Sequence, residues 1–247
     1  MKLAHMDRKD FIKASSLIIA AEMLLPDMSC TTDKKTTIRN NWAGNYSYKA
    51  PNFYEPKSVE ELQELVKKLG KQKALGSRHC FNDIADSPQS QISTRALNKV
   101  IALDKDKNTI NIEGGIRYGD FAEELDKEGY ALHNLASLPH ITVAGACATA
   151  THGSGVTLGN LATAVAAMQI VSPGGEIVEI ERRHPDFNGL IVGLGAIGIV
   201  TKVLLEIQKR FEVRQDVFQE LPLASIEKHF DEIMSSGYSV SIVFPQR

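Results

Sequence analysis

The sequence has 247 residues, enough for one large domain or two small ones, and its 43% hydrophobic and 23% charged residues are typical of a globular protein. The formal net charge of −2 gives no electrostatic reason to expect a nucleic-acid partner. Three scattered cysteines argue against a disulfide framework and against a structural zinc site.

The first 30 residues resemble an export signal. The basic run Arg8-Lys9-Asp10-Phe11-Ile12-Lys13 precedes a short apolar stretch at 17–25 and is similar to a twin-arginine signal with lysine as the second basic residue. We therefore expect residues 1–30 to direct export to the periplasm, with Cys30 as a membrane tether if the signal is of the lipoprotein type. The alternative is a cytoplasmic protein with an amphipathic N-terminal helix. Residues 31–44 are then a polar linker and lead-in.

The middle of the chain shows clear helix and hairpin patterns. A capping box at 58–61 precedes apolar residues at helical spacing, and Gly70 ends that helix. A short strand is expected at 73–75. Residues 100–104 and 109–113 flank a charged turn and predict a hairpin. An amphipathic helix follows, with Gly129 as its expected C-terminal cap.

The remaining segments continue this mixture. Residues 164–171 and 176–180 flank a Ser-Pro-Gly-Gly turn and predict a second hairpin. The pattern then predicts a strand at 201–207, a helix at 225–234 and a strand at 238–244. Because helices and hairpins are mixed without a steady β-α-β alternation, the sequence favours the α+β class over a doubly wound sheet.

Two separate blocks carry chemical information. In the first, residues 75–82 place His79 directly after a Gly-Ser turn, where glycine lets backbone N–H groups approach a phosphate. The imidazole can serve as nucleophile, base or ligand. The second block, at 134–155, is rich in small and hydroxylated residues, and we expect it to lay backbone along an extended polar cofactor.

A third motif, Gly193-Leu194-Gly195-Ala196-Ile197-Gly198, fits the glycine pattern of dinucleotide-binding turns. That interpretation needs a helix after the glycines and an acidic residue about 20 positions later. Here a strand-like segment follows, and Asp216 is only a marginal match for the acid. We expect instead a tight helix-to-strand turn that lines another ligand.

Together the blocks resemble flavoprotein oxidases with the vanillyl-alcohol-oxidase (PCMH-type) FAD-binding fold, and among these the alditol and sugar-1,4-lactone oxidases, which include xylitol, L-gulonolactone and D-arabinono-lactone oxidases. The matching motifs begin at Asn41-Trp42-Ala43-Gly44-Asn45, pass through both blocks and residues 194–198, and extend weakly to 217–223. The resemblance implies an α+β FAD-binding domain of two subdomains at 45–212, followed by the start of a substrate domain at 213–247.

The resemblance also assigns roles to residues. It implies that His79 bonds covalently to the 8α-methyl group of FAD, that residues 75–81 wrap the pyrophosphate, and that Ser137 faces the substrate hydroxyls as a catalytic residue. Arg78 stands where such proteins often have glycine, and Cys80 and Cys147 are interpreted as small buried residues rather than as a second covalent link. The implied cofactor-binding residues are Leu75, Gly76, Ser77, Arg78, His79, Cys80, Phe81, Ser137, Thr142, Gly145, Thr149, Ala150, Thr151, His152 and Val200.

The implied activity is oxidation of a CH–OH group of an alditol or sugar-1,4-lactone, with hydride transfer to flavin N5 and reoxidation by O2 to H2O2. One alternative is a dehydrogenase with another electron acceptor. Because such enzymes continue well beyond Arg247, we expect this chain to be truncated, so a flavin-binding fragment without catalysis is a further alternative. A metal site remains the least favoured hypothesis, since its four candidate ligands lack tight spacing: His79, His133, His140 and His152.

Overall fold

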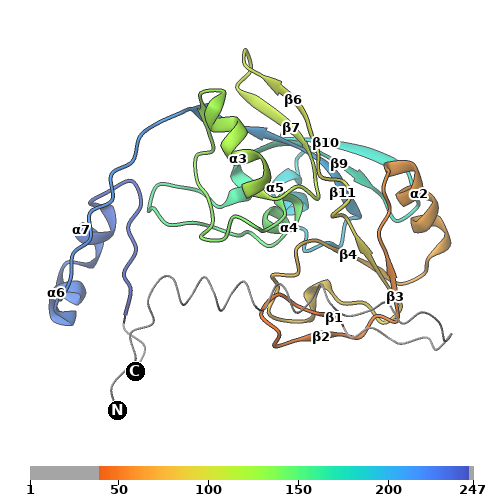
Figure 1. Cartoon of the computed structure of the whole chain (residues 1–247), viewed down its shortest axis with the longest axis horizontal. Helices are drawn as coiled ribbons and strands as arrows, with labels where there is room; N and C mark the ends of the chain where they lie inside the picture. The colour runs from red at the N-terminus through yellow and green to blue at the C-terminus, as the bar shows by residue number, and fades with distance from the viewer. Residues whose placement is uncertain (1–38, 245–247) are drawn as a thin grey trace, which may run out of the picture. The chain divides into compact units, whose positions relative to one another are not determined.

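The computed structural model describes residues 39–244 (Figure 1). The predicted export signal at 1–30, with Cys30, lies outside the described residues. Among residues 39–244, no helix is both long and apolar enough to cross a membrane.

The N-terminal part is a small α+β unit. Its sheet has the order β3-β5-β4, and both pairings are parallel. Helix α2 begins after Ser58, whose side-chain oxygen accepts the backbone N–H of Glu61 at 3.2 Å, and it buries Leu62 and Val66. The elements are β1 (Arg39–Asn40), β2 (Ser47–Tyr48), β3 (Asn52–Tyr54), α2 (Val59–Lys68), β4 (Gln72–Leu75), the 3-10 helix η1 (Asp83–Ala85) and β5 (Ser90–Ser93).

The second part contains a five-stranded antiparallel sheet with the order β10-β9-β11-β7-β6. In β11, alternate residues from Ile199 to Leu205 are buried, as expected for a strand with one face on the core. The strands are β6 (Val100–Asp104), β7 (Thr109–Glu113), β9 (Val165–Val171), β10 (Ile177–Glu181) and β11 (Ile199–Glu206). Both predicted hairpins are confirmed to within a residue at each end.

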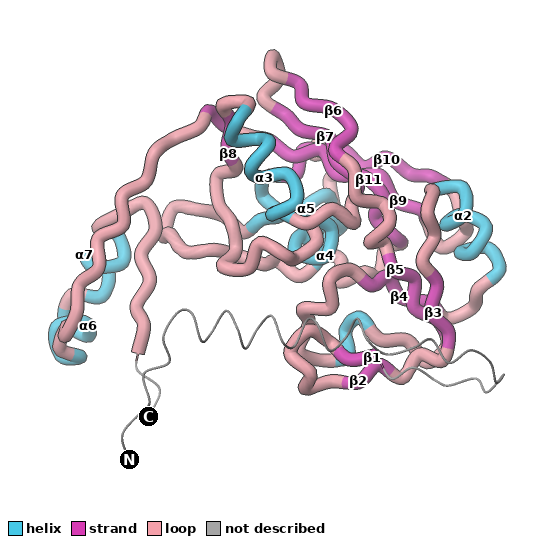
Figure 2. Tube along the Cα trace, in the orientation of Figure 1, coloured by secondary structure: helices cyan, strands magenta, loops and turns pink. Residues whose placement is uncertain are grey.

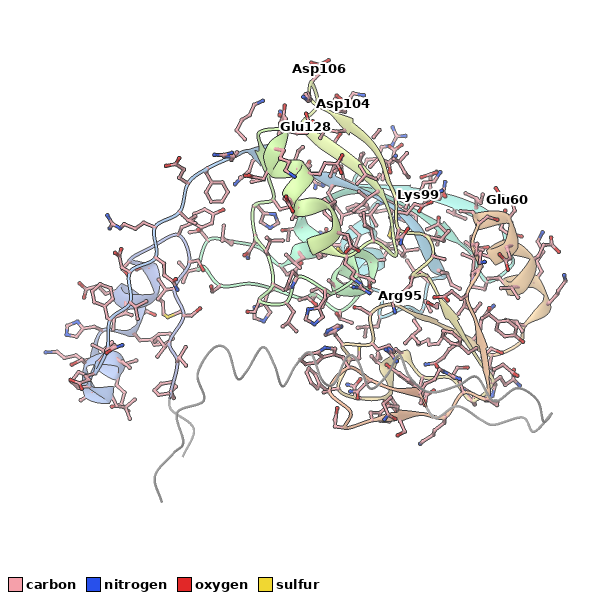
Figure 3. The ribbon with its side chains drawn as sticks, viewed as in Figure 1. Glu60, Arg95, Lys99, Asp104, Asp106 and Glu128 are labelled. Carbon is pink, nitrogen blue, oxygen red and sulfur yellow. The ribbon has the colours of Figure 1, made fainter. Side chains whose placement is uncertain are left out.

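The β6–β7 hairpin owes its sharp boundaries to its turn. An oxygen of the Asp104 carboxylate accepts the backbone N–H groups of Asp106 and Lys107, at 3.1 and 3.0 Å. Lys105 forms an ion pair with Glu128 at 2.7 Å, beyond the end of α3 (Tyr118–Lys127). Figure 3 shows Asp104, Asp106 and Glu128 gathered at this end of the molecule.

Short helices pack on the five-stranded sheet (Figure 2). Helix α3 buries Tyr118, Phe121 and Leu125, in line with the predicted amphipathic pattern. Gly129 follows it with φ +81°, the left-handed conformation expected of a C-terminal cap. The other elements are β8 (Tyr130–Ala131), which pairs with β12 (Gln208–Lys209), α4 (Val143–Ala148), the 3-10 helix η2 (Leu161–Ala164) and α5 (Phe187–Ile191).

A small second core joins the two parts. Leu62 and Val66 of α2 and Ile92 of β5 pack with Val171 and Ile199, which belong to the larger sheet. The side-chain amide of Gln63 also donates to the carbonyl of Gly175 in the β9–β10 turn, at 2.7 Å. The architecture therefore consists of two connected α+β subdomains, which confirms the predicted fold class.

The structure corrects two predictions near the C-terminus. The single helix expected at 225–234 is two short helices, α6 (Leu223–Lys228) and α7 (Phe230–Ser235), because the backbone at His229 (φ −123°, ψ 28°) leaves the helical conformation. The strand expected at 238–244 is wrong, since within the described chain these residues have no regular structure. An apolar alternation cannot make a strand without a neighbour to share its backbone hydrogen bonds.

Candidate functional site

One cavity, with a volume of about 390 Å³, collects most of the predicted cofactor-binding residues. All of them line it except Ala150 and His152. The imidazole of His152 instead lies 2.8 Å from the carbonyl of Gly153. Leu194, Gly195 and Gly198 of the glycine-rich motif also line the cavity, as expected of a turn beside a ligand. The other lining residues were not among the predicted cofactor-binding residues: Lys73, Ala74, Ile84, Ala85, Thr94, Ala136, Leu138, Ile141, Ala144, Ala146 and Ala148.

Ser77 joins the two sequence blocks. Its hydroxyl oxygen accepts the backbone N–H of Thr142 at 3.0 Å, although the two residues are 65 positions apart. The same oxygen lies 3.0 Å from Nδ1 of His79. A single hydroxyl therefore fixes the loop after β4 against the start of α4 and orients the His79 ring.

Two glycines make this junction close. A Cβ atom on Gly76 would overlap the Thr142 side chain, and one on Gly145 would lie 2.8 Å from the Thr142 hydroxyl oxygen. Such separations are shorter than side chains tolerate, so both positions require glycine for the observed packing. This tightly packed junction of Gly76, Thr142 and Gly145 forms part of the cavity wall.

The His79 ring is held in a partly apolar setting. It stacks on Trp42 with ring centroids 5.0 Å apart, and its Nε2 is buried with no hydrogen-bond partner among residues 39–244. Burial lowers the pKa of His79, and the nearby imidazole of His140 lowers it further. The ring is therefore neutral at pH 7 and keeps a lone pair available for a ligand.

Arg78 occupies a strained position before this histidine. Its φ of +64° lies in the left-handed region, which costs a non-glycine residue about 1–2 kcal/mol. The guanidinium donates to the carbonyl of Asn40 at 3.3 Å, and the Arg78 carbonyl accepts the N–H of Trp42 at 2.8 Å. These bonds hold the residue in its conformation and fasten the lead-in segment to the loop.

The side-chain amides of two asparagines bond to the same loop. The sequence analysis did not predict these supporting contacts. Asn41 donates to the carbonyl of Cys80 at 3.0 Å, and Asn45 donates to the carbonyl of Phe81 at 3.1 Å. A fully bonded asparagine side chain is a common device for ordering irregular backbone. The Asn-Trp-Ala-Gly-Asn motif is thus a support for the loop that carries His79.

The two cysteines differ. Cys147 is buried, as predicted, and burial raises the pKa of its thiol to about 12. Cys80 is only half-buried and lines the cavity, which corrects the expectation that both are buried. Burial raises its pKa as well, so both sulfurs are protonated thiols rather than nucleophilic thiolates at neutral pH.

The second block is partly helical. Residues 143–148 form the short helix α4, and its small side chains leave space that the cavity occupies. Ser137 is exposed and lies on the cavity wall. The block therefore supplies both a helical wall and an accessible hydroxyl.

The glycine-rich motif forms the tight turn that its sequence predicted. It connects α5 to β11, with Leu194 and Gly195 at φ values of +50° and +70°. The ammonium group of Lys73 donates to the carbonyl of Leu194 at 3.0 Å, which ties the turn to β4 across the cavity. The sequence predicted only that Lys73 lies in a strand, and did not predict its contact with this turn.

The four histidines considered for a metal site are not gathered. Only His79 and His140 adjoin, with ring centroids 4.6 Å apart, whereas His133 lies against Thr163. Within the described range, no three His, Cys, Asp or Glu side chains form a group that could hold a metal ion.

Comparison with known proteins places this geometry in context. Residues 50–181 match the family described as "FAD binding domain". The chain is 40% identical to an alditol oxidase from a Streptomyces strain, over 84% of the chain and 50% of that protein. It is 30% identical to L-gulonolactone oxidase from Mus musculus, over 83% and 48%, and 29% identical to L-gulono-1,4-lactone dehydrogenase from Mycobacterium tuberculosis, over 84% and 49%. The chain spans about half the length of the curated relatives it matches.

Proposed function

Because the chain belongs to the FAD-binding domain family, with the PCMH-type α+β fold, we propose that the cavity around His79 holds FAD as part of an oxidoreductase acting on CH–OH groups. The substrate class that we propose is an alditol or a sugar-1,4-lactone. The observation that carries the proposal is the junction of Ser77, His79 and Thr142 on the wall of one cavity.

The residues present fit the cofactor. Glycine at 76 and 145 lets the loop after β4 and helix α4 pack directly against Thr142, and all three residues line the cavity with backbone or a hydroxyl. The buried Nε2 of His79, without a partner in residues 39–244, is a polar atom whose cost would be removed by a bound ligand. When bound, FAD supplies the chemistry by accepting a hydride from a substrate C–H bond.

His79 is proposed as the covalent anchor of the flavin. Its lowered pKa keeps the imidazole neutral, and Ser77 and Trp42 fix the plane of the ring. A neutral, oriented nitrogen is what nucleophilic attachment requires. The remaining cavity residues would then hold the phosphates and adenosine without further covalent bonds.

Ser137 is proposed to contact the substrate. Its side chain is exposed on the cavity wall, whereas the Ser77 hydroxyl is already committed to two partners. A hydroxyl in this position can orient a polyol by exchanging hydrogen bonds with it.

Purification of the 247-residue chain tests the cofactor assignment. The protein should show flavin absorption bands, and the yellow colour should remain with acid-precipitated protein. A colourless protein that takes up no added FAD would contradict the cofactor assignment, and colour lost to the acid supernatant would contradict the covalent anchor alone.

Two electron acceptors, O2 and a quinone or cytochrome, are distinguished by experiment. We favour O2, because two of the similar proteins are named oxidases, while the third, named a dehydrogenase, supports a different acceptor. The test is anaerobic bleaching of the flavin by xylitol or L-gulono-1,4-lactone, followed by stopped-flow reoxidation. Fast recovery of absorbance with O2 supports an oxidase, whereas recovery only with a quinone or cytochrome supports a dehydrogenase.

A further inference from the structure

Three rings from separate segments of the chain form a cluster: Trp42, His79 and His140. The His79 ring contacts both other rings, with centroid distances of 5.0 Å to Trp42 and 4.6 Å to His140. Trp42 and His140 also contact each other, at 5.5 Å. His79 lines the cavity and His140 does not, so His140 can act there only through His79.

The cluster contains two buried nitrogens with unmet hydrogen-bonding capacity. Nε2 of His79 and Nε2 of His140 are both shielded from solvent and bond to nothing in the part of the chain that the structure describes. A buried polar atom without a hydrogen-bond partner lowers the stability of the folded state. Two of them in adjoining rings are an expensive arrangement for a purely structural cluster, which points to a chemical use.

We propose that His140 is the base for flavin attachment: it accepts the proton that the His79 imidazole must lose when it bonds to the flavin. This inference rests on the covalent anchor proposed above. It adds a role for a residue that lies outside the cofactor cavity.

The net reaction needs such a proton acceptor. A carbon–nitrogen bond forms between His79 and the flavin 8-methyl carbon, which loses one hydrogen as a proton. The imidazole loses its N–H proton, and the two electrons left on the flavin pass to dioxygen, which takes up two protons and leaves as H2O2. The change is therefore balanced when one base receives the proton of His79 and returns it to solvent.

The surroundings of His79 offer few other candidates. The other charged groups that act on it are Arg78 and Arg117, which carry permanent positive charge and cannot accept a proton. Ser77 lies next to the ring, but its hydroxyl is a far weaker base than an imidazole. No carboxylate in residues 39–244 is among the groups whose charge affects His79.

His140 is suited to the role by its position. The two histidine rings adjoin, with centroids 4.6 Å apart and planes tilted by 52°, so the imidazole of His140 is the base that lies against the His79 ring. His140 as a residue is half-buried, so it lies between the cluster and solvent. Trp42 covers the cluster with a face that carries no proton acceptor.

The experiment follows flavin attachment separately from flavin binding. The 247-residue chain is prepared without flavin by expression under riboflavin limitation and then mixed with FAD in air. Acid-stable flavin fluorescence measures covalent attachment, and fluorescence quenching measures non-covalent affinity. The variants are His140→Ala and His140→Phe, which keeps a ring in the cluster, with His184→Ala as the control because His184 is an exposed histidine outside it.

We expect attachment to slow by about 100-fold in both His140 variants, with FAD affinity and melting temperature close to those of the original chain. Added imidazole should restore attachment in His140→Ala, where it can enter the vacated space, but not in His140→Phe. Attachment at the original rate in His140→Phe, failure of imidazole to restore it in His140→Ala, or a parallel loss of FAD affinity would each overturn the role of His140. If the original chain itself attaches no flavin, the covalent anchor fails first, which distinguishes the two failures.

Discussion

Two stretches without regular structure are stabilised to very different degrees in this molecule. The loop at 76–82 is held by hydrogen bonds to distant segments: the side chains of Asn41 and Asn45 donate to its carbonyls, and the backbone N–H of Thr142 donates to the Ser77 hydroxyl. The segment at 210–222 exposes large apolar side chains instead, with Val217 and Phe218 at 71% and 86% exposure. Order in this protein therefore follows long-range hydrogen bonding and burial more than helix or strand content.

Of the substitutions in these two stretches, we expect the largest effect at His79, in the loop at 76–82. His79→Ala should remove all acid-stable flavin while the chain stays folded, because the ring is only partly buried and its neighbours can close around an alanine. Acid precipitation followed by fluorescence of the pellet measures this, with circular dichroism to check the fold. Colour that stays with the pellet of this variant would show that another residue carries the flavin.

Gly76→Ala should have the next largest effect. The added methyl group would overlap the Thr142 side chain, and overpacking of this kind typically costs about 1–3 kcal/mol. Gly189→Ala is the matched control, since a Cβ there meets nothing within 4 Å and the residue lies inside α5. Urea unfolding should show a destabilised Gly76 variant and an unchanged or slightly more stable Gly189 variant. Equal unfolding midpoints would mean that Gly76 is not tightly packed against Thr142.

Asp86→Asn should show a pH-dependent loss. Burial opposes ionisation of Asp86, but bonds from the N–H groups of Lys49 and Ser87 and from the Tyr46 hydroxyl outweigh it, and the net pKa lies below 3.8. A lowered pKa contributes stability above the unfolded value of 3.8 that is lost as pH falls through the folded value.

We therefore expect Asp86→Asn to lower the free energy of unfolding by ~1 kcal/mol at pH 7. Below pH 3.8 the free energies of unfolding of the variant and the original chain should become equal. Denaturant unfolding at a series of pH values measures the difference. The exposed Asp106→Asn serves as the control. A difference that stays constant down to the lowest pH would rule out the charge of Asp86 as its source.

The smallest effect belongs to the exposed segment. Phe218→Ser removes a side chain that is 86% exposed, so stability should change by less than ~0.5 kcal/mol. Thermal unfolding checks this value. A clear destabilisation would show that the segment at 210–222 is better packed than the comparison implies.

The sequence predicted those parts of the fold whose signals are local. The β6–β7 hairpin carries its own turn, and α2 carries its own cap at Ser58, so both appear at their expected positions. Strand β5 was missed because its sequence, Ser-Gln-Ile-Ser, has no apolar alternation, although all four residues are buried between parallel neighbours. The false strand at 238–244 shows the reverse case, in which the pattern exists without a partner.

In the candidate site, too, the features with local sequence signals were predicted and those that depend on distant contacts were not. Glycine, serine and histidine in the loop after β4 form a motif that the sequence displays openly. The contributions of Trp42, His140 and Lys73 depend on contacts with rings or carbonyls far away in the chain, which no local pattern records. The chemistry was therefore more predictable than the supports that position it.

The bond between Ser77 and Thr142 has a consequence for the order of assembly. It closes a loop of 65 residues, and contacts so distant in sequence form late during folding, after the local hairpins and helices. A chain that has not completed this step cannot present an oriented His79. We expect covalently bound flavin to mark only molecules that have finished folding, so the colour of a preparation would report its native fraction.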